Sequence, residues 1–179
     1  MQPRKMSIAV TYGLITGLVL ILLTTILYLG GVNVFISYSF VAYILVIVAA
    51  VLAAIMEKKA GSGFLEFREA LKAAFLVFVI ALLLQSLFTW VLVNFIDTGF
   101  RTVLEQATLE KVEKFMQSMK LNQEAIDKAL DEQRGKNQYA LPKLLLGLCF
   151  TYIVCFLISL LIAAIVKRKK PEFHDTAFK

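Results

Sequence analysis

Charged residues are missing from long stretches of this 179-residue chain. No Asp, Glu, Lys, Arg or His occurs between Met6 and Met56, and two further uncharged stretches cover residues 73–96 and 144–166. Charged residues make up 18% of the chain and hydrophobic residues 59%. Soluble domains have about 25% charged and about 45–50% apolar residues. This distribution excludes an ordinary soluble fold, a disordered chain and a disulfide-stabilised secreted domain.

The uncharged stretches have the length of membrane-spanning helices. A helix needs about 20 apolar residues to cross a hydrocarbon core of about 30 Å. The first stretch is long enough for two crossings, and the turn formers Gly30-Gly31-Val32-Asn33 divide it. Because lipid offers the backbone no hydrogen-bond partner, the spans must be helices. We predict one all-α membrane domain over residues 1–179, with spans at 7–29, 35–56, 73–96 and 143–166.

The first span is preceded by Arg4 and Lys5, as a secretory signal peptide would be. Its apolar run is longer than the roughly 7–15 residues of a signal-peptide core, and no small-x-small cleavage site follows it. We therefore expect a retained signal anchor.

Positive charge sets the orientation of the predicted bundle, because short cytoplasmic loops are rich in Lys and Arg. Arg4 and Lys5, the connection at 57–72 and the tail at 167–179 all carry cations and all fall on one side. That side is predicted to be cytoplasmic, with both termini inside. The tail cations are candidates for binding anionic lipid headgroups: Lys167, Arg168, Lys169 and Lys170. The net charge of +6 is thus explained by topology, and no nucleic-acid partner is expected.

The segment between the third and fourth spans is predicted to be an extracytoplasmic helical hairpin at 98–135. Apolar residues recur three and four apart from Leu104 to Met119, which predicts an amphipathic helix at 99–119. Asn122 is a good N-cap for a second helix that ends near Gly135. The two helices are expected to pack together or to lie on the membrane surface. The hairpin is either a solvated connector or a docking platform for an extracytoplasmic partner.

Residue types that carry chemistry are scarce. The single histidine, His174, lies in the tail, so a zinc or haem site is not expected. Cys149 and Cys155 are six residues apart on one helix and cannot bridge each other. No charged residue lies within a span, which argues against ion-coupled transport. Asp97 is expected to be a helix-end residue that faces water; the alternative is a residue partly buried at the outer rim. We predict no catalytic residue, no cofactor and no metal.

Small and polar residues within the spans are candidates for helix packing, because they let helices approach closely and form hydrogen bonds. The candidates are Gly13, Gly17, Ala49, Ala53, Gln85, Ser159 and Ala163. The alternative is a polar permeation path.

Several segments together resemble a bacterial family known as domain of unknown function 4199. They are Tyr12-Gly13-Leu14-x-x-Gly17, Phe64-x-x-Phe67-x-Glu69-Ala70-Leu71-Lys72, Asp97 and residues 159–165. The resemblance covers essentially the whole chain. It implies a small multi-pass protein of the bacterial inner membrane and supplies no established activity.

These observations favour a non-enzymatic structural or interaction component that works by contact with lipids, a second copy or another membrane protein. The alternative is a passive or weakly coupled transporter of a small neutral or apolar solute that uses Gln85, Thr89 and Thr151 in an oligomer. A third option is a lipid-directed membrane enzyme with its site near Asp97.

Overall fold

The computed structural model describes residues 8–133 and 137–168, and this part of the chain is helical apart from its turns and one isolated β-bridge. The elements in chain order are α1 (Ile8–Leu29), α2 (Val32–Tyr38), α3 (Phe40–Ala60), α4 (Phe67–Val91), the π-helix η1 (Leu92–Ile96), α5 (Thr98–Ser118), α6 (Gln123–Asp131) and α7 (Leu141–Val166). Four helical segments are long and apolar enough to cross a membrane: Ile8–Leu29, Val32–Ala60, Phe67–Ile96 and Leu141–Val166. The prediction of an all-α fold with four such helices is confirmed.

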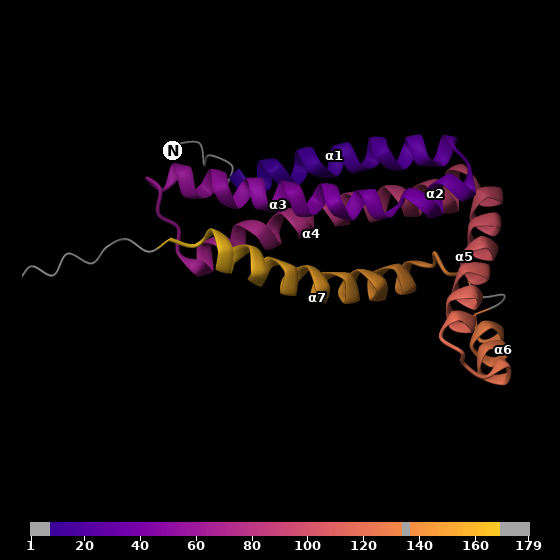
Figure 1. Ribbon diagram of the computed structural model, residues 1–179. Coiled ribbons are helices and arrows are strands. Elements are labelled where there is room, and N and C mark those ends of the chain that lie inside the picture. Colours follow the sequence, from indigo (N-terminus) through magenta and orange to yellow (C-terminus); the bar gives the residue numbers. More distant parts are fainter. Residues whose placement is uncertain (1–7, 134–136, 169–179) are drawn as a thin grey trace, which may run out of the picture.

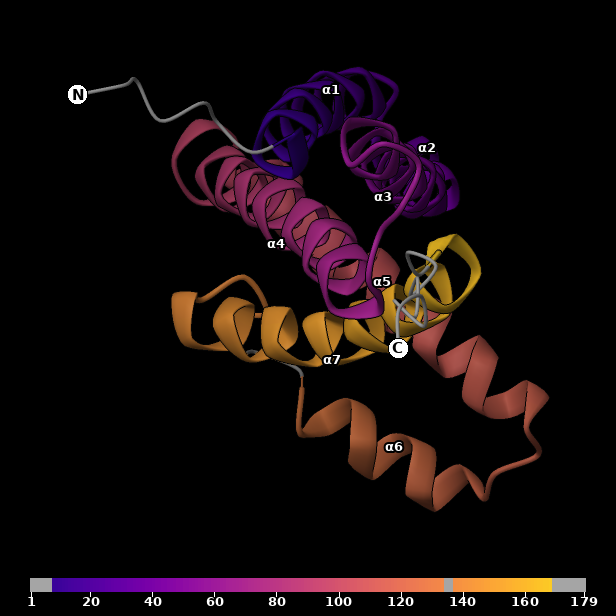
Figure 2. The ribbon, with the colours of Figure 1, turned by 90° about the vertical axis from the view of Figure 1, so that its left-hand side faces the viewer.

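The long helices lie side by side, and α4 is the central one (Figures 1 and 2). α4 contacts α1, α3 and α7, and α7 reaches α3 as well. Alanines fill much of the shared core, so the helix backbones approach closely; Ala50, Ala53, Ala70, Ala74 and Ala81 are all fully buried.

Large apolar side chains cover the outside of the bundle. Leu22 on α1 is 64% exposed, Phe150 on α7 is 64% exposed and Ile165 is 82% exposed. A surface of this kind is costly in water and suits lipid, which is as apolar as the side chains themselves. The pattern supports a membrane environment for the four long helices.

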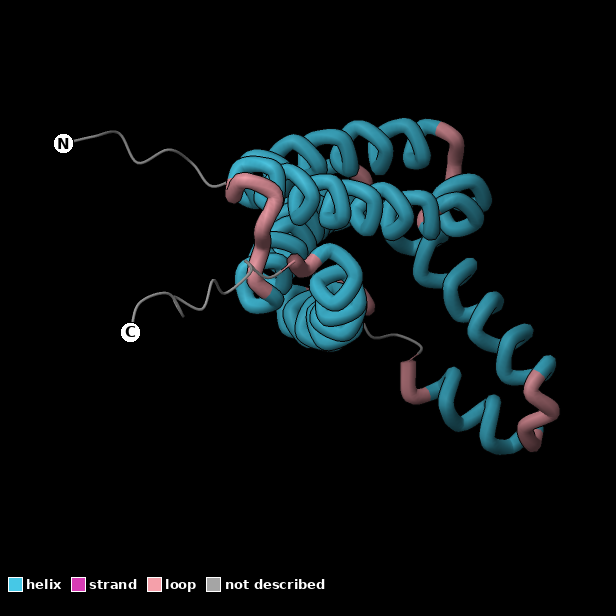
Figure 3. The backbone as a smooth tube through the Cα atoms, turned by 60° about the vertical axis from the view of Figure 1, so that its left-hand side comes forward, coloured by secondary structure: helices cyan, strands magenta, loops and turns pink. Residues whose placement is uncertain are grey.

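The bundle has two unlike ends (Figure 1). At the proximal end α1 begins, α3 connects to α4 and α7 finishes; at the distal end α1 meets α2, α4 passes through η1 into α5, and α7 begins. α5 runs across the distal end, and α6 turns back from its far tip (Figure 3). α6 contacts α5 and buries Ile126 and Leu130.

The helices extend beyond the predicted spans at several ends. The second span begins at Val32 directly after the predicted Gly-Gly turn, where Gly31 has a φ of 86°, and the short α2 leads into α3 at Ser39. α3 continues to Ala60, and α4 begins at Phe67, six residues before the uncharged stretch starts. Charge limits a hydrophobic stretch but does not end a helix, because charged side chains at helix ends can reach water.

Candidate functional site

Polar side chains gather at the distal end, where α4, α5 and the segment before α7 meet. This group, called the distal cluster below, consists of Tyr28, Asn94, Asp97, Arg101, Glu105, Asn137, Gln138 and Tyr139. Its members come from α1, η1 and α5, from the junction between η1 and α5, and from the segment between α6 and α7.

Asp97 forms the joint between η1 and α5. Its Oδ1 accepts the Phe100 backbone N–H at 2.8 Å, which caps the first turn of α5, and its Oδ2 accepts the Tyr28 hydroxyl at 2.9 Å. The Phe100 N–H and the Tyr28 hydroxyl, in that order of effect, stabilise the charged form and lower the pKa of Asp97 below its ordinary value. Asp97 is therefore half-buried and bonded, which differs from the predicted water-facing helix end.

Asn94 lies in the π-helix and joins three segments. Its amide nitrogen donates to the carbonyls of Trp90 at 3.0 Å and Tyr139 at 3.2 Å. Its amide oxygen accepts from Arg101 Nη1 at 3.1 Å and from Asn137 at 3.5 Å. A single π-turn inside an α-helix changes the direction of the side chains that follow. Here it accompanies an amide that holds α5 and the start of α7 together.

Glu105 ties α5 to the segment before α7 a second time. Its Oε1 accepts the backbone N–H of Gln138 at 2.8 Å. The neighbouring Tyr139 is partly buried, and this burial, with the charge of Glu105 as a smaller cause, raises the pKa of Tyr139 to about 12. The phenol therefore stays neutral at physiological pH.

A small apolar core lies beneath the distal cluster. Val93, Phe100 and Leu104 are buried in it, and the Phe100 ring meets the rings of Tyr28 and Phe35 edge-on at 4.8 and 5.5 Å. This core fixes the first half of α5 on α1 and α2, and the hydrogen bonds above it fix the direction of the helix.

The bonds of Asp97 limit what its carboxyl group can do chemically. A general base needs a pKa near the working pH and a free lone pair directed at a substrate. The carboxyl of Asp97 has a lowered pKa, and both of its oxygens accept hydrogen bonds from the protein. These properties suit a group that positions helices.

The predicted packing glycines lie between α1 and α4. Gly13 and Gly17 are buried, and a Cβ atom on Gly13 would come within 2.9 Å of Ile80 Cβ. A Cβ atom on Gly17 would come within 2.6 Å of Leu84 Cδ1. The absence of side chains at these two positions allows the close approach of the two helices.

The other packing candidates have different surroundings. Ala53 and Ala163 are fully buried, whereas Ala49 is partly buried against the core. The Ser159 hydroxyl is buried and donates to the Cys155 carbonyl of its own helix at 2.7 Å. Gln85 donates to the Thr24 hydroxyl at 3.4 Å, which links α4 to α1. The Thr151 hydroxyl donates to the Gly147 carbonyl of its own helix. Gln85 and Thr151, which the transporter alternative uses together, therefore bond to different groups.

The proximal end carries a second set of contacts. Leu65 and Arg168 form an antiparallel bridge through two backbone hydrogen bonds of 2.9 Å, and Lys58 Nζ donates to the Val166 carbonyl at 2.8 Å. The exposed Lys167 and Arg168 lie over the rings of Phe67 and Phe64. Lys169, Lys170 and His174 lie outside the described residues.

A family model described as "Protein of unknown function (DUF4199)" matches residues 11–168. The chain belongs to this family. No curated protein and no solved structure matches it. The family match extends over both the distal cluster and the contacts at the proximal end, so these features lie within the domain that defines DUF4199.

Two features of this DUF4199 chain were not predicted. The first is the π-helix with Asn94, because an asparagine near a span end gives no sign of a local change in helix pitch. The second is a cavity of about 500 Å³ at the proximal end, lined by residues of α1, α3 and α4 that include Glu57, Glu69 and Lys72. Within residues 8–133 and 137–168, no group of three or more His, Cys, Asp or Glu side chains could hold a metal ion.

Proposed function

We propose that this protein is a non-enzymatic component of the bacterial inner membrane that works by contact with lipids or other proteins. The observation that carries the proposal is the distal cluster, whose carboxylates accept hydrogen bonds from groups of the protein itself. Such a cluster holds the first half of α5 in a fixed position at the end of the bundle, and α6 packs on α5, so the outer surface of both helices is available for contacts.

The proposed orientation places the distal end outside the cytoplasm and both termini inside. The distribution of Lys and Arg supports it, since the proximal end carries Lys58, Lys59, Lys167 and Arg168. The cations of the tail are proposed to bind anionic lipid headgroups at the cytoplasmic face.

Two measurements on the full-length protein separate this function from transport. The first is the flux of a small neutral solute such as glycerol or urea into liposomes that contain the wild type or the Gln85→Leu variant. We expect flux no faster than in protein-free liposomes for both. A flux that the wild type accelerates and Gln85→Leu lowers would support the transporter alternative and overturn the proposal.

The second measurement is photo-crosslinking in cells from a reactive residue placed at exposed Lys128 on α6. The matched control carries the reactive residue at Leu161 on α7, which is 66% exposed on the apolar surface of the bundle. We expect a protein adduct of defined mass from position 128 and lipid adducts from position 161. Lipid adducts alone from both positions, together with solute flux or turnover, would contradict an interaction role.

A further inference from the structure

The second half of α5 extends beyond the bundle with an apolar face that no part of the described chain covers. Its first half is anchored by Phe100 and Leu104, which are buried in the small distal core. Further along, Phe115 is 64% exposed, and Met119, the C-cap residue directly after α5, is 58% exposed. These two residues are four apart, so they lie on the same face of the helix.

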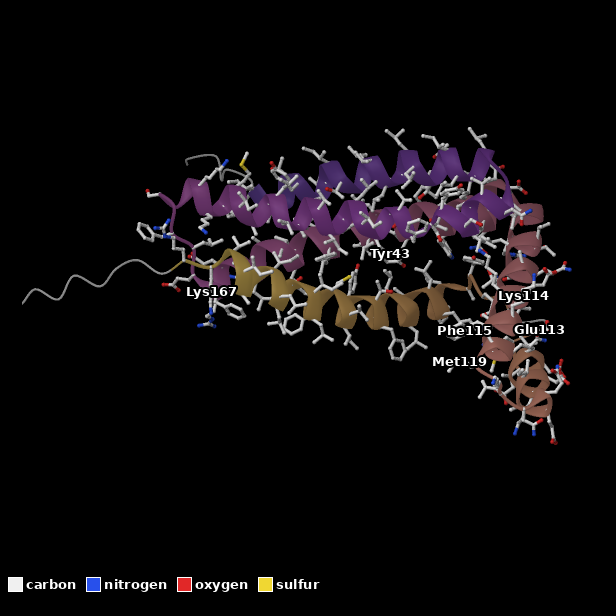
Figure 4. All side chains as sticks on the ribbon, viewed as in Figure 1. Tyr43, Glu113, Lys114, Phe115, Met119 and Lys167 are labelled. Atoms are coloured by element: carbon white, nitrogen blue, oxygen red, sulfur yellow. The ribbon has the colours of Figure 1, made fainter. Side chains whose placement is uncertain are left out.

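The direction of that face is set by how α5 crosses the bundle. In Figure 4, Phe115 and Met119 project from α5 toward the side on which the long helices lie, and Glu113 and Lys114 lie on the other side of the helix. α5 extends past the bundle at this point, so the space that Phe115 and Met119 face is beside the long helices.

Lipid is what occupies that space when the four long helices cross a membrane. Apolar side chains are exposed at the distal ends of these helices: Phe95 is 69% exposed, Ile96 is 62% exposed and Leu141 is 44% exposed. The hydrocarbon boundary therefore reaches close to the level of α5. A helix that lies along this boundary buries its apolar face about 5–10 Å into the region between headgroups and acyl chains.

We propose that the second half of α5 is an interfacial helix that inserts Phe115 and Met119 into the lipid leaflet at the distal end. This inference rests on the proposed function and deepens it, because it names lipid as the partner of one face of α5. The proximal end would contact headgroups through cations, whereas this face would contact acyl chains through apolar burial.

The charges of this half of α5 determine which lipids it binds. Its charged residues balance, with two glutamates and two lysines: Glu110, Lys111, Glu113 and Lys114. A neutral polar face gains nothing from anionic headgroups, so the insertion should occur in zwitterionic lipid alone.

Tryptophan fluorescence in liposomes tests the inference. The native Trp90 is replaced by Phe, and a single new tryptophan is introduced as Phe115→Trp, with Met119→Trp as a second variant. Glu113→Trp, on the opposite side of the same helix, is the matched control. Each full-length variant is reconstituted into phosphatidylcholine that carries bromine on its acyl chains, and quenching by bromine and by aqueous acrylamide is measured.

We expect Phe115→Trp and Met119→Trp to emit at shorter wavelength than Glu113→Trp, with severalfold stronger quenching by the brominated lipid. Acrylamide should quench the tryptophan of Glu113→Trp more strongly. Equal quenching of all three variants by acrylamide overturns the inference, because the face would then lie in water. Protection of the tryptophans in Phe115→Trp and Met119→Trp from both quenchers overturns it in favour of a protein partner or a second copy. Solute flux is measured separately, so failure here is distinguishable from failure of the proposed function.

Discussion

Single residues without side chains determine how closely the central helices pack. At Gly13 an added Cβ atom would come within 2.9 Å of Ile80 Cβ, which is attached to the α4 backbone and cannot rotate away. At Gly147 on α7 an added Cβ atom would meet nothing within 4 Å. The two glycines therefore offer a matched pair in which the same substitution has different surroundings.

We predict that Gly13→Ala destabilises the bundle by about 1–3 kcal/mol, because α1 and α4 must move apart to admit the methyl group. Gly147→Ala should be neutral or stabilising by up to about 1 kcal/mol, since alanine is the better helix former. The measurement is the free energy of unfolding of each variant in mixed detergent micelles, with denaturing detergent as the variable. If both variants change stability equally and in the same direction, steric contact at Gly13 is not what limits the packing.

At the scale of elements, the start of α5 depends on the ionisation of Asp97. Hydrogen bonds from Phe100 and Tyr28 lower the pKa of Asp97 in the folded state. A carboxyl group whose pKa is lower in the folded than in the unfolded state stabilises the fold above its ordinary pKa. That contribution is lost as the pH falls through the lowered folded-state pKa.

We therefore predict that Asp97→Asn speeds amide hydrogen exchange in the first turn of α5 at neutral pH. The difference from the wild type should shrink as the pH falls below the ordinary range of an aspartate. Asp127→Asn is the control, because Asp127 accepts a bond from the Gln123 side chain on exposed α6. An effect of Asp97→Asn that stays the same at neutral and strongly acidic pH would show that the charge of Asp97 does not support the helix.

The elements differ in how far the sequence could predict them. Long uncharged stretches and the Gly30-Gly31 turn indicated the four long helices, because the requirement to bond every backbone group in lipid leaves no other structure. The N-cap at Asn122 was also predictable, and the structure has its side chain accepting the Glu124 N–H at 3.3 Å. Both features are local in sequence, and their physical causes act over a few residues.

The distal cluster could be predicted only in part. Asp97 is recognisable in the sequence as the charged residue at the end of the third predicted span, but the partners that complete the cluster are distant in sequence. The bond from Tyr28 to Asp97 spans 69 residues, and the bond from Asn94 to Tyr139 spans 45. Such contacts depend on the tilt of α7 and on the direction that η1 gives to α5. A hydrophobic pattern predicts neither of these.

At the scale of the whole molecule, the two ends of the bundle are held together by different kinds of contact. At the proximal end, Lys167 and Arg168 lie over aromatic rings, and a backbone bridge joins the loop between α3 and α4 to the residues that follow α7. The distal end holds α5 by a bonded carboxylate and an amide. The excess of Lys and Arg at the proximal end is the basis of the orientation proposed above, because short cytoplasmic loops are rich in these residues.

That orientation is testable with cysteines placed at each end of a chain in which Cys149→Ser and Cys155→Ala remove the native thiols. Exposed Lys120 follows α5 at the distal end, and exposed Lys59 lies near the end of α3 at the proximal end. In intact cells an impermeant thiol reagent should label Lys120→Cys and not Lys59→Cys, because the proposed orientation keeps the cation-rich end in the cytoplasm. Breaking the cells should make both positions reactive, which serves as the control for accessibility. Labelling of position 59 with protection of position 120 would reverse the molecule in the membrane, and α5 would then lie on the cytoplasmic leaflet.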